Sequence, residues 1–229
     1  MDMLWFFTTL IEAGIFIPVC IIFYRYKFLT TELKILALYV AITVIRNSIG
    51  ILADILTVLH KKSFYNLFYY NWHNVLGFYT IAVIFYRLFT NKIWKTFVVF
   101  AGIVFTVFVA LETKTSAITD INTIYFNRYT YTVSNLFILI IVLGYFYQLL
   151  QDLNVENITK FSYFWMGVGL LLYFGGSLFV YLFLINAKKD TAQISWIINT
   201  FLSLLLYIAI SFTFWYSNLL SNKDTSHNG

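Results

Sequence analysis

Long apolar segments, each near the length needed to cross a lipid bilayer, dominate this sequence. A transmembrane α-helix needs about 20 mostly apolar residues, because each residue adds about 1.5 Å across a hydrocarbon core about 30 Å thick. Short polar stretches such as HKKSFYN and NAKKDTAQIS separate the apolar segments. Seven segments meet the requirement: Leu4–Tyr24, Leu33–Leu59, Leu67–Phe89, Ile93–Leu111, Tyr131–Leu150, Tyr163–Ile185 and Trp196–Leu219.

The composition agrees with a chain that lies mostly in lipid. Hydrophobic residues make up 61% of the 229 residues and charged residues only 11%, whereas soluble domains carry about 25% charged residues. We therefore predict an all-α fold, an integral membrane bundle of seven transmembrane helices. It forms one domain over residues 1–221, and a disordered polar tail follows at residues 222–229. The longest connection, residues 112–130, is the one with room for a small structured lid.

The distribution of Lys and Arg predicts the orientation, because loops rich in these residues stay in the cytoplasm. The first segment has no Lys or Arg before it and is followed by Arg25, Lys27 and Lys34. We expect the N-terminus outside and the C-terminus in the cytoplasm. The loops and tail on the predicted cytoplasmic side carry Arg25, Lys27, Lys34, Arg87, Lys92, Lys95, Lys160 and Lys223, and the opposite side carries Lys61, Lys62, Lys114, Arg128, Lys188 and Lys189.

Polar and ionisable side chains inside the predicted spans gather in the half nearer the outside. Helical rise places His73 about 9 Å, Glu12 about 12 Å and Asp54 about 8 Å below the outer surface. A charge in mid-membrane costs about 2.5–3.5 kcal/mol on insertion scales, so such groups usually turn inward and find partners. The residues that we expect to bind a ligand in this layer are Glu12, Arg46, Asp54, Trp72, His73, Asn74, Trp196 and Asn199.

Helical phase refines this prediction, because residues three, four and seven apart share one face of a helix. Thr43, Asn47, Gly50 and Asp54 form one stripe, with Arg46 beside it. A second stripe, Gly169, Tyr173 and Gly176, is small enough to let a neighbouring helix approach closely. Two interpretations of the polar layer stay open. It is either a set of bonds that hold the helices together or the wall of a pocket that opens to the outside.

Several chemistries lack the residues they need. His73 is the only histidine well inside a predicted span, and neither HxxxH nor HExxH occurs, so we expect no haem and no metal site. The sequence has no glycine-rich phosphate-binding loop, so we expect no cofactor. The net charge of +5 is spread over the loops without a long basic run, which argues against a nucleic-acid partner. The single cysteine, Cys20, lies in an apolar run and is expected to be a small buried apolar residue.

Three stretches carry a resemblance to other proteins: RYKFLTTELKILALYVAIT at residues 25–43, FWMGVGLLLYFGGSLFVYLF at 164–183 and WIINTFLSLLLYIAI at 196–210. Together they resemble a group of uncharacterised bacterial seven-transmembrane-helix proteins often encoded beside sensor kinases. The resemblance covers most of the chain. It implies a multipass protein of the bacterial inner membrane and a signalling partner such as a kinase, and it assigns no site residue.

The leading functional hypothesis is a multipass membrane receptor or sensor component. A small extracellular ligand would enter an outward-facing polar pocket, and a separate protein would receive the signal. The alternative is a small transporter or channel subunit, which would need a polar route through the inner half as well. A third hypothesis is a membrane enzyme acting on lipid or isoprenoid, with Glu12 and either Asp54 or His73 as its acid–base pair. A catalytic function is not the leading expectation.

Overall fold

A computed structural model describes residues 11, 13–60, 67–119, 128–151, 161–184 and 189–217, with side chains for residues 11, 13–52, 71–113, 129–151, 161–180 and 197–217. These residues form helices and no strand. Their bounds follow the predicted spans closely except for the first, fourth and seventh spans, and the helix of the seventh span begins at Lys189 rather than at Trp196. The helices are η1 (Ala13–Ile15), α2 (Phe16–Arg25), η2 (Tyr26–Phe28), α3 (Thr31–His60), α4 (Leu67–Leu88), α5 (Lys92–Thr119), α6 (Arg128–Gln151), α7 (Ser162–Leu184) and α8 (Lys189–Trp215).

Five of these helices contain a described segment that is long and apolar enough to cross a bilayer. The segments are Thr31–Leu52, Lys92–Thr113, Tyr129–Gln151, Ser162–Val180 and Ile197–Trp215. The chain is therefore a helical multipass membrane protein. Helix α4 is not among the five, since Asn71, His73 and Asn74 lower the hydropathy of its described part. Residues 13–24 of the first predicted span form η1 and most of α2. Cys20 on α2 is exposed, so the prediction that it is buried is wrong.

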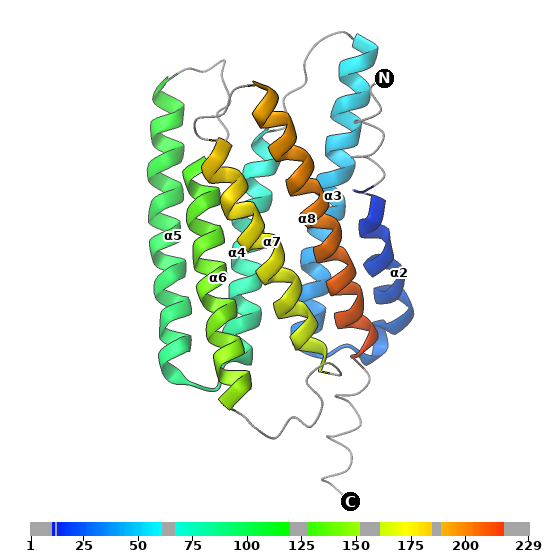
Figure 1. Ribbon diagram of the computed structural model, residues 1–229, viewed down its shortest axis with the longest axis vertical. Helices are drawn as coiled ribbons and strands as arrows, with labels where there is room; N and C mark the ends of the chain where they lie inside the picture. The colour runs from blue at the N-terminus through cyan, green and yellow to red at the C-terminus, as the bar shows by residue number, and fades with distance from the viewer. Residues whose placement is uncertain are drawn as a thin grey trace, which may run out of the picture.

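The helices lie side by side, and consecutive helices run in opposite directions (Figure 1). In that view the upper end of the bundle holds the C-terminal ends of α3, α5 and α7 and the N-terminal ends of α4, α6 and α8. We call the opposite end the lower end. Helix α7 packs against both α6 and α8, α4 packs against α3 and α6, and α5 lies at the edge against α4 and α6.

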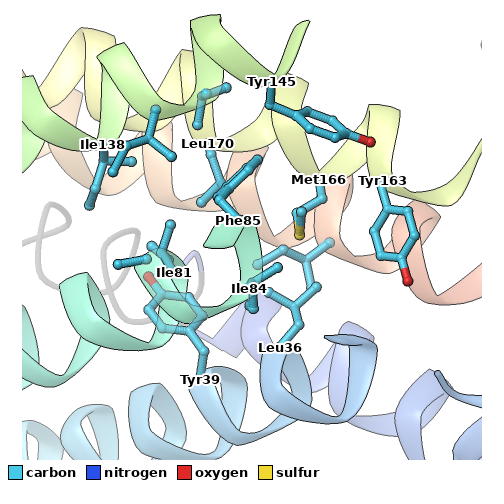
Figure 2. Close-up of a cluster of buried hydrophobic side chains, with 14 of the residues drawn as sticks. Leu36, Tyr39, Ile81, Ile84, Phe85, Ile138, Tyr145, Tyr163, Met166 and Leu170 are labelled. Atoms are coloured by element: carbon cyan, nitrogen blue, oxygen red, sulfur yellow. The ribbon is translucent and has the colours of Figure 1, made fainter. Parts of the chain in front are cut away.

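An apolar core fills the lower and middle parts of the bundle. Figure 2 shows side chains from α3, α4, α6 and α7 that point toward one another. Leu36, Ile81, Phe85 and Met166 have no exposed surface, and Leu170 is almost fully buried. Large apolar side chains from four helices therefore close this part of the bundle to water.

Glycines set the close contact between α7 and α8. A Cβ atom at Gly169 would lie 2.5 Å from the Cβ of Ala209, and one at Gly176 would lie 2.4 Å from Leu202 Cδ1. Both distances are too short for a real contact. A larger residue at Gly169 would force the two helices apart, because the Ala209 Cβ cannot turn away, whereas at Gly176 the end of the Leu202 side chain would have to move. The prediction that this stripe lets a neighbouring helix approach closely is confirmed.

Helix α5 is longer than the sequence predicts, and this corrects the interpretation of residues 112–130. Residues 112–119 continue α5, and α6 begins at Arg128. The Glu112 carboxylate accepts hydrogen bonds from the backbone N–H groups of Tyr129 at 3.3 Å and Thr130 at 2.7 Å. An acid at this place satisfies N–H groups that the first turn of α6 leaves unpaired and complements its helix dipole. Residues 112–119 and 128–130 of this connection are therefore helix, and residues 120–127 lie outside the described residues.

Side chains at the lower end join helices that are distant in the sequence. Arg87 Nε of α4 donates to Glu32 Oε1 of α3 at 2.9 Å. Gln148 of α6 accepts from the Thr90 backbone N–H at 3.0 Å and donates to the Leu88 carbonyl at 3.4 Å. These contacts hold the short turn between α4 and α5 against α6 and fix the base of α4 against α3.

Candidate functional site

A small cavity lies between α3, α4, α6 and α7, above the apolar core. Its volume is about 30 Å³, which is enough for about two water molecules. Polar and aromatic side chains dominate its wall. The lining residues are Tyr39, His73, Asn74, Gly77, Phe78, Tyr131, Asn135, Tyr173 and Phe174.

His73 is held against α3 by Thr43. The Thr43 hydroxyl lies 3.1 Å from His73 Nε2 and donates to the Tyr39 carbonyl at 2.9 Å. A threonine hydroxyl has only one hydrogen to donate. His73 Nε2 must therefore carry the hydrogen of the shared bond, which leaves His73 Nδ1 as an acceptor. This bond gives the imidazole one tautomer and fixes its position on the cavity wall.

Asn74 connects α4 to α6. The Ser134 hydroxyl lies 3.0 Å from Asn74 Oδ1 and 2.9 Å from the Tyr131 carbonyl. Asn74 is 8% exposed and Asn135 is 2% exposed. The Nδ2 atoms of both amides are buried and have no hydrogen-bond partner among the described residues. A buried polar group without a partner costs about 1–3 kcal/mol, so the amides beside this cavity keep unused capacity to bind a polar group.

Gly77 lets Tyr39 close over the cavity. A Cβ atom at Gly77 would lie 3.2 Å from Tyr39 Cε2, which is tighter than an ordinary contact. The Tyr39 and His73 rings are 6.0 Å apart between centroids. The small residue on α4 therefore brings the tyrosine of α3 beside the histidine.

The structure brings two of the predicted ligand residues, His73 and Asn74, into this cavity. Arg46 lies one turn beyond Thr43, and its Nη1 donates to Asn47 Oδ1 at 2.6 Å. Asn199 Oδ1 instead accepts from Ser177 at 2.8 Å, so it joins α7 to α8 and does not line the cavity.

Trp72 also differs from its prediction as aromatic wall. It is 52% exposed on the outer surface of the bundle and does not line the cavity. Asp54 and Trp196 belong to α3 and α8, but their side chains lie outside the described residues, as does all of Glu12. The proposed convergence of Glu12 and Asp54 with His73 stays a prediction.

Several residues of the site are not among the predicted ligand residues. Tyr39, Tyr131 and Tyr173 supply three aromatic walls, and Asn135 supplies a second buried amide. The sequence could have identified Asn135 as a site residue, because helical rise puts it at the same depth as His73 and Asn74. Helical phase places Tyr173 in a stripe that faces a neighbouring helix, but nothing in the sequence separates Tyr39 and Tyr131 from the many tyrosines that face the membrane interface.

The described side chains contain no group of three or more His, Cys, Asp or Glu residues close enough to hold a metal ion. None of the described residues that line the cavity is acidic. Its chemistry is therefore hydrogen bonding by amides, hydroxyls and one imidazole, next to aromatic surface.

No family model, curated protein or solved structure matches this chain.

Proposed function

We propose that this protein is a membrane receptor or sensor component that binds a small ligand in the cavity of the upper half. In this proposal seven helices cross the bacterial inner membrane, with the upper end outside and the lower end in the cytoplasm. The observation that carries the proposal is the wall of the cavity. His73, Asn74 and Asn135 meet there, and two buried amides keep hydrogen-bonding capacity that no described residue uses.

The size of the cavity suggests how binding would produce a signal. Ligand sites usually measure about 300–1,000 Å³, and this cavity holds about 30 Å³. A ligand of more than a few atoms would have to separate α4 from α3 or α6. Binding would then favour a different packing of the helices, and the size of the response would follow the difference in affinity for the two packings.

The apolar core below the cavity supports a receptor over a transporter. A transported solute would need a polar route past Ile81, Phe85 and Met166, which have no exposed surface. Helix α4 connects the cavity to the lower end of the bundle. His73 and Asn74 are near its start, and Arg87, which pairs with Glu32 of α3, is near its end. We propose that a change at the cavity reaches the cytoplasmic end through α4, where a separate partner such as a sensor kinase receives it.

The test is a thermal-shift screen of the purified protein in detergent. The probes are amino acids, small carboxylates, sugars and nucleosides, which all present hydrogen-bonding groups. A compound present at 100 times its Kd stabilises the fold by about 2.7 kcal/mol. We expect at least one compound to raise the Tm, and Asn135→Leu to remove the response while the protein stays folded.

Thr213→Val is the matched control. Thr213 is equally buried, but its hydroxyl donates to Ala209 of its own helix and it does not line the cavity. The control should respond like the wild type. Equal responses of Asn135→Leu and the wild type, or flux of the stabilising compound through protein-containing liposomes, would remove the receptor proposal.

A further inference from the structure

The described side chains at the lower end of the bundle are mostly basic where they are charged. Among them is one acid, Glu32, which pairs with Arg87. No described acid pairs with the remaining cations there. We call these five the basic rim: Arg25, Lys27, Lys34, Lys92 and Lys95.

Three cations of the basic rim lie over aromatic rings. The Arg25 guanidinium is 4.7 Å from the ring centre of Trp215, Lys34 Nζ is 5.9 Å from Tyr26 and Lys95 Nζ is 5.7 Å from Tyr86. Each ring is about half exposed on the outer surface of the bundle. Tyrosine and tryptophan favour the level of the lipid headgroups, so these contacts place the cations at that level too.

Helix α5 combines such cations with a long apolar face. Its first turn carries Lys92 and Lys95, and Val99, Ile103 and Val107 follow at spacings of four residues from Lys95. These three apolar side chains are 51–61% exposed. Only 17% of the α5 span is buried, against 28–44% for the other four spans. The partner of α5 must therefore supply both an anionic group at the lower end and an apolar chain above it.

We propose that an anionic phospholipid binds α5, with its phosphate at Lys92 and Lys95 and its acyl chains along Val99, Ile103 and Val107. Charge complementarity and the adjoining apolar face argue for this one occupant. A free phosphate would leave the apolar face uncovered, and a second copy of this chain would bring a second basic rim against the first. The inference does not rest on the proposed function.

The experiment titrates the purified protein in a neutral detergent with phosphatidylglycerol or phosphatidylcholine of identical acyl chains. Tm is the readout for each lipid. We expect phosphatidylglycerol to stabilise the protein at lower concentration than phosphatidylcholine. A lysine near an anionic surface contributes about 1 kcal/mol, so neutralising both in Lys92→Gln/Lys95→Gln should weaken the apparent affinity for phosphatidylglycerol about 30-fold.

Lys61→Gln/Lys62→Gln is the matched control. It removes the same amount of charge just after the upper end of α3, far from Lys92 and Lys95, and should respond to both lipids like the wild type. Unchanged stability of Lys92→Gln/Lys95→Gln in phosphatidylcholine shows that this variant folds. Equal effects of the two lipids, or a wild-type response of Lys92→Gln/Lys95→Gln, would overturn the proposal. So would stabilisation by inorganic phosphate alone, or a lipid-independent dimer found by mass photometry of the same samples.

Discussion

At the scale of single residues, helical phase decides which polar side chains reach the interior. On α4, Asn74, Phe78 and Ile81 are buried, whereas Trp72 and Leu76 are exposed. Trp72 lies about 200° around the helix from Asn74, since each residue turns the helix by about 100°. This geometry explains why the sequence predicts His73 and Asn74 correctly as inward residues and why Trp72, close to them in sequence, is not part of the wall.

The Thr43–His73 contact gives a prediction at this scale. Thr43→Val keeps the shape of the side chain but removes the oxygen that accepts from His73 Nε2. The free energy of unfolding should fall by about 1–3 kcal/mol, because the imidazole N–H is left buried without a partner. Thr43→Ser keeps the oxygen and should lose less. Thermal unfolding in detergent measures both variants. Unchanged stability of Thr43→Val, or a larger loss in Thr43→Ser than in Thr43→Val, would contradict the role of the hydrogen bond.

At the scale of helices, the sequence predicts bounds well where hydrocarbon thickness sets them and poorly where it does not. The predicted Leu67–Phe89 and the observed α4 agree within one residue. The prediction ends the fourth span at Leu111 because the apolar run ends there, but α5 continues to Thr119. Backbone hydrogen bonds continue beyond the apolar stretch, and Glu112 gains a role at the start of α6 that hydropathy does not report.

The α7–α8 contact gives a prediction for a helix pair. Gly169→Ala should destabilise the protein by about 1–3 kcal/mol, since its new Cβ overlaps Ala209 and overpacked sites shift side chains and backbone. Gly175→Ala on the same helix is the matched control. Its Cβ would lie 3.7 Å from Leu139, an ordinary contact. A lower Tm for Gly169→Ala alone supports the close contact, whereas equal Tm values for both variants would contradict it.

At the scale of the whole molecule, the class of protein could be predicted and the cavity could not. Lipid imposes length and apolarity on each crossing helix, and both are visible in the sequence. The cavity depends instead on how Tyr39, Asn135 and Tyr173 meet across three helices. Shifts of an ångström decide whether such side chains fill a space or leave one. The sequence could predict a polar layer there but not its walls.

The Lys and Arg residues at the lower end predict the orientation of the whole bundle in the membrane. Cytoplasmic ends of membrane helices are enriched in Lys and Arg, and the described lower end has six such residues against one acid, Glu32. We expect this end in the cytoplasm. In a Cys20→Ser background expressed in bacterial cells, an impermeant maleimide should label Lys61→Cys, which follows the upper end of α3, but not Thr90→Cys, which lies in the lower turn between α4 and α5. After lysis both should react, which controls for accessibility. Labelling of Thr90→Cys alone in intact cells would reverse the bundle. The cavity would then lie nearer the cytoplasm, and the ligand of the proposed receptor would have to come from inside the cell.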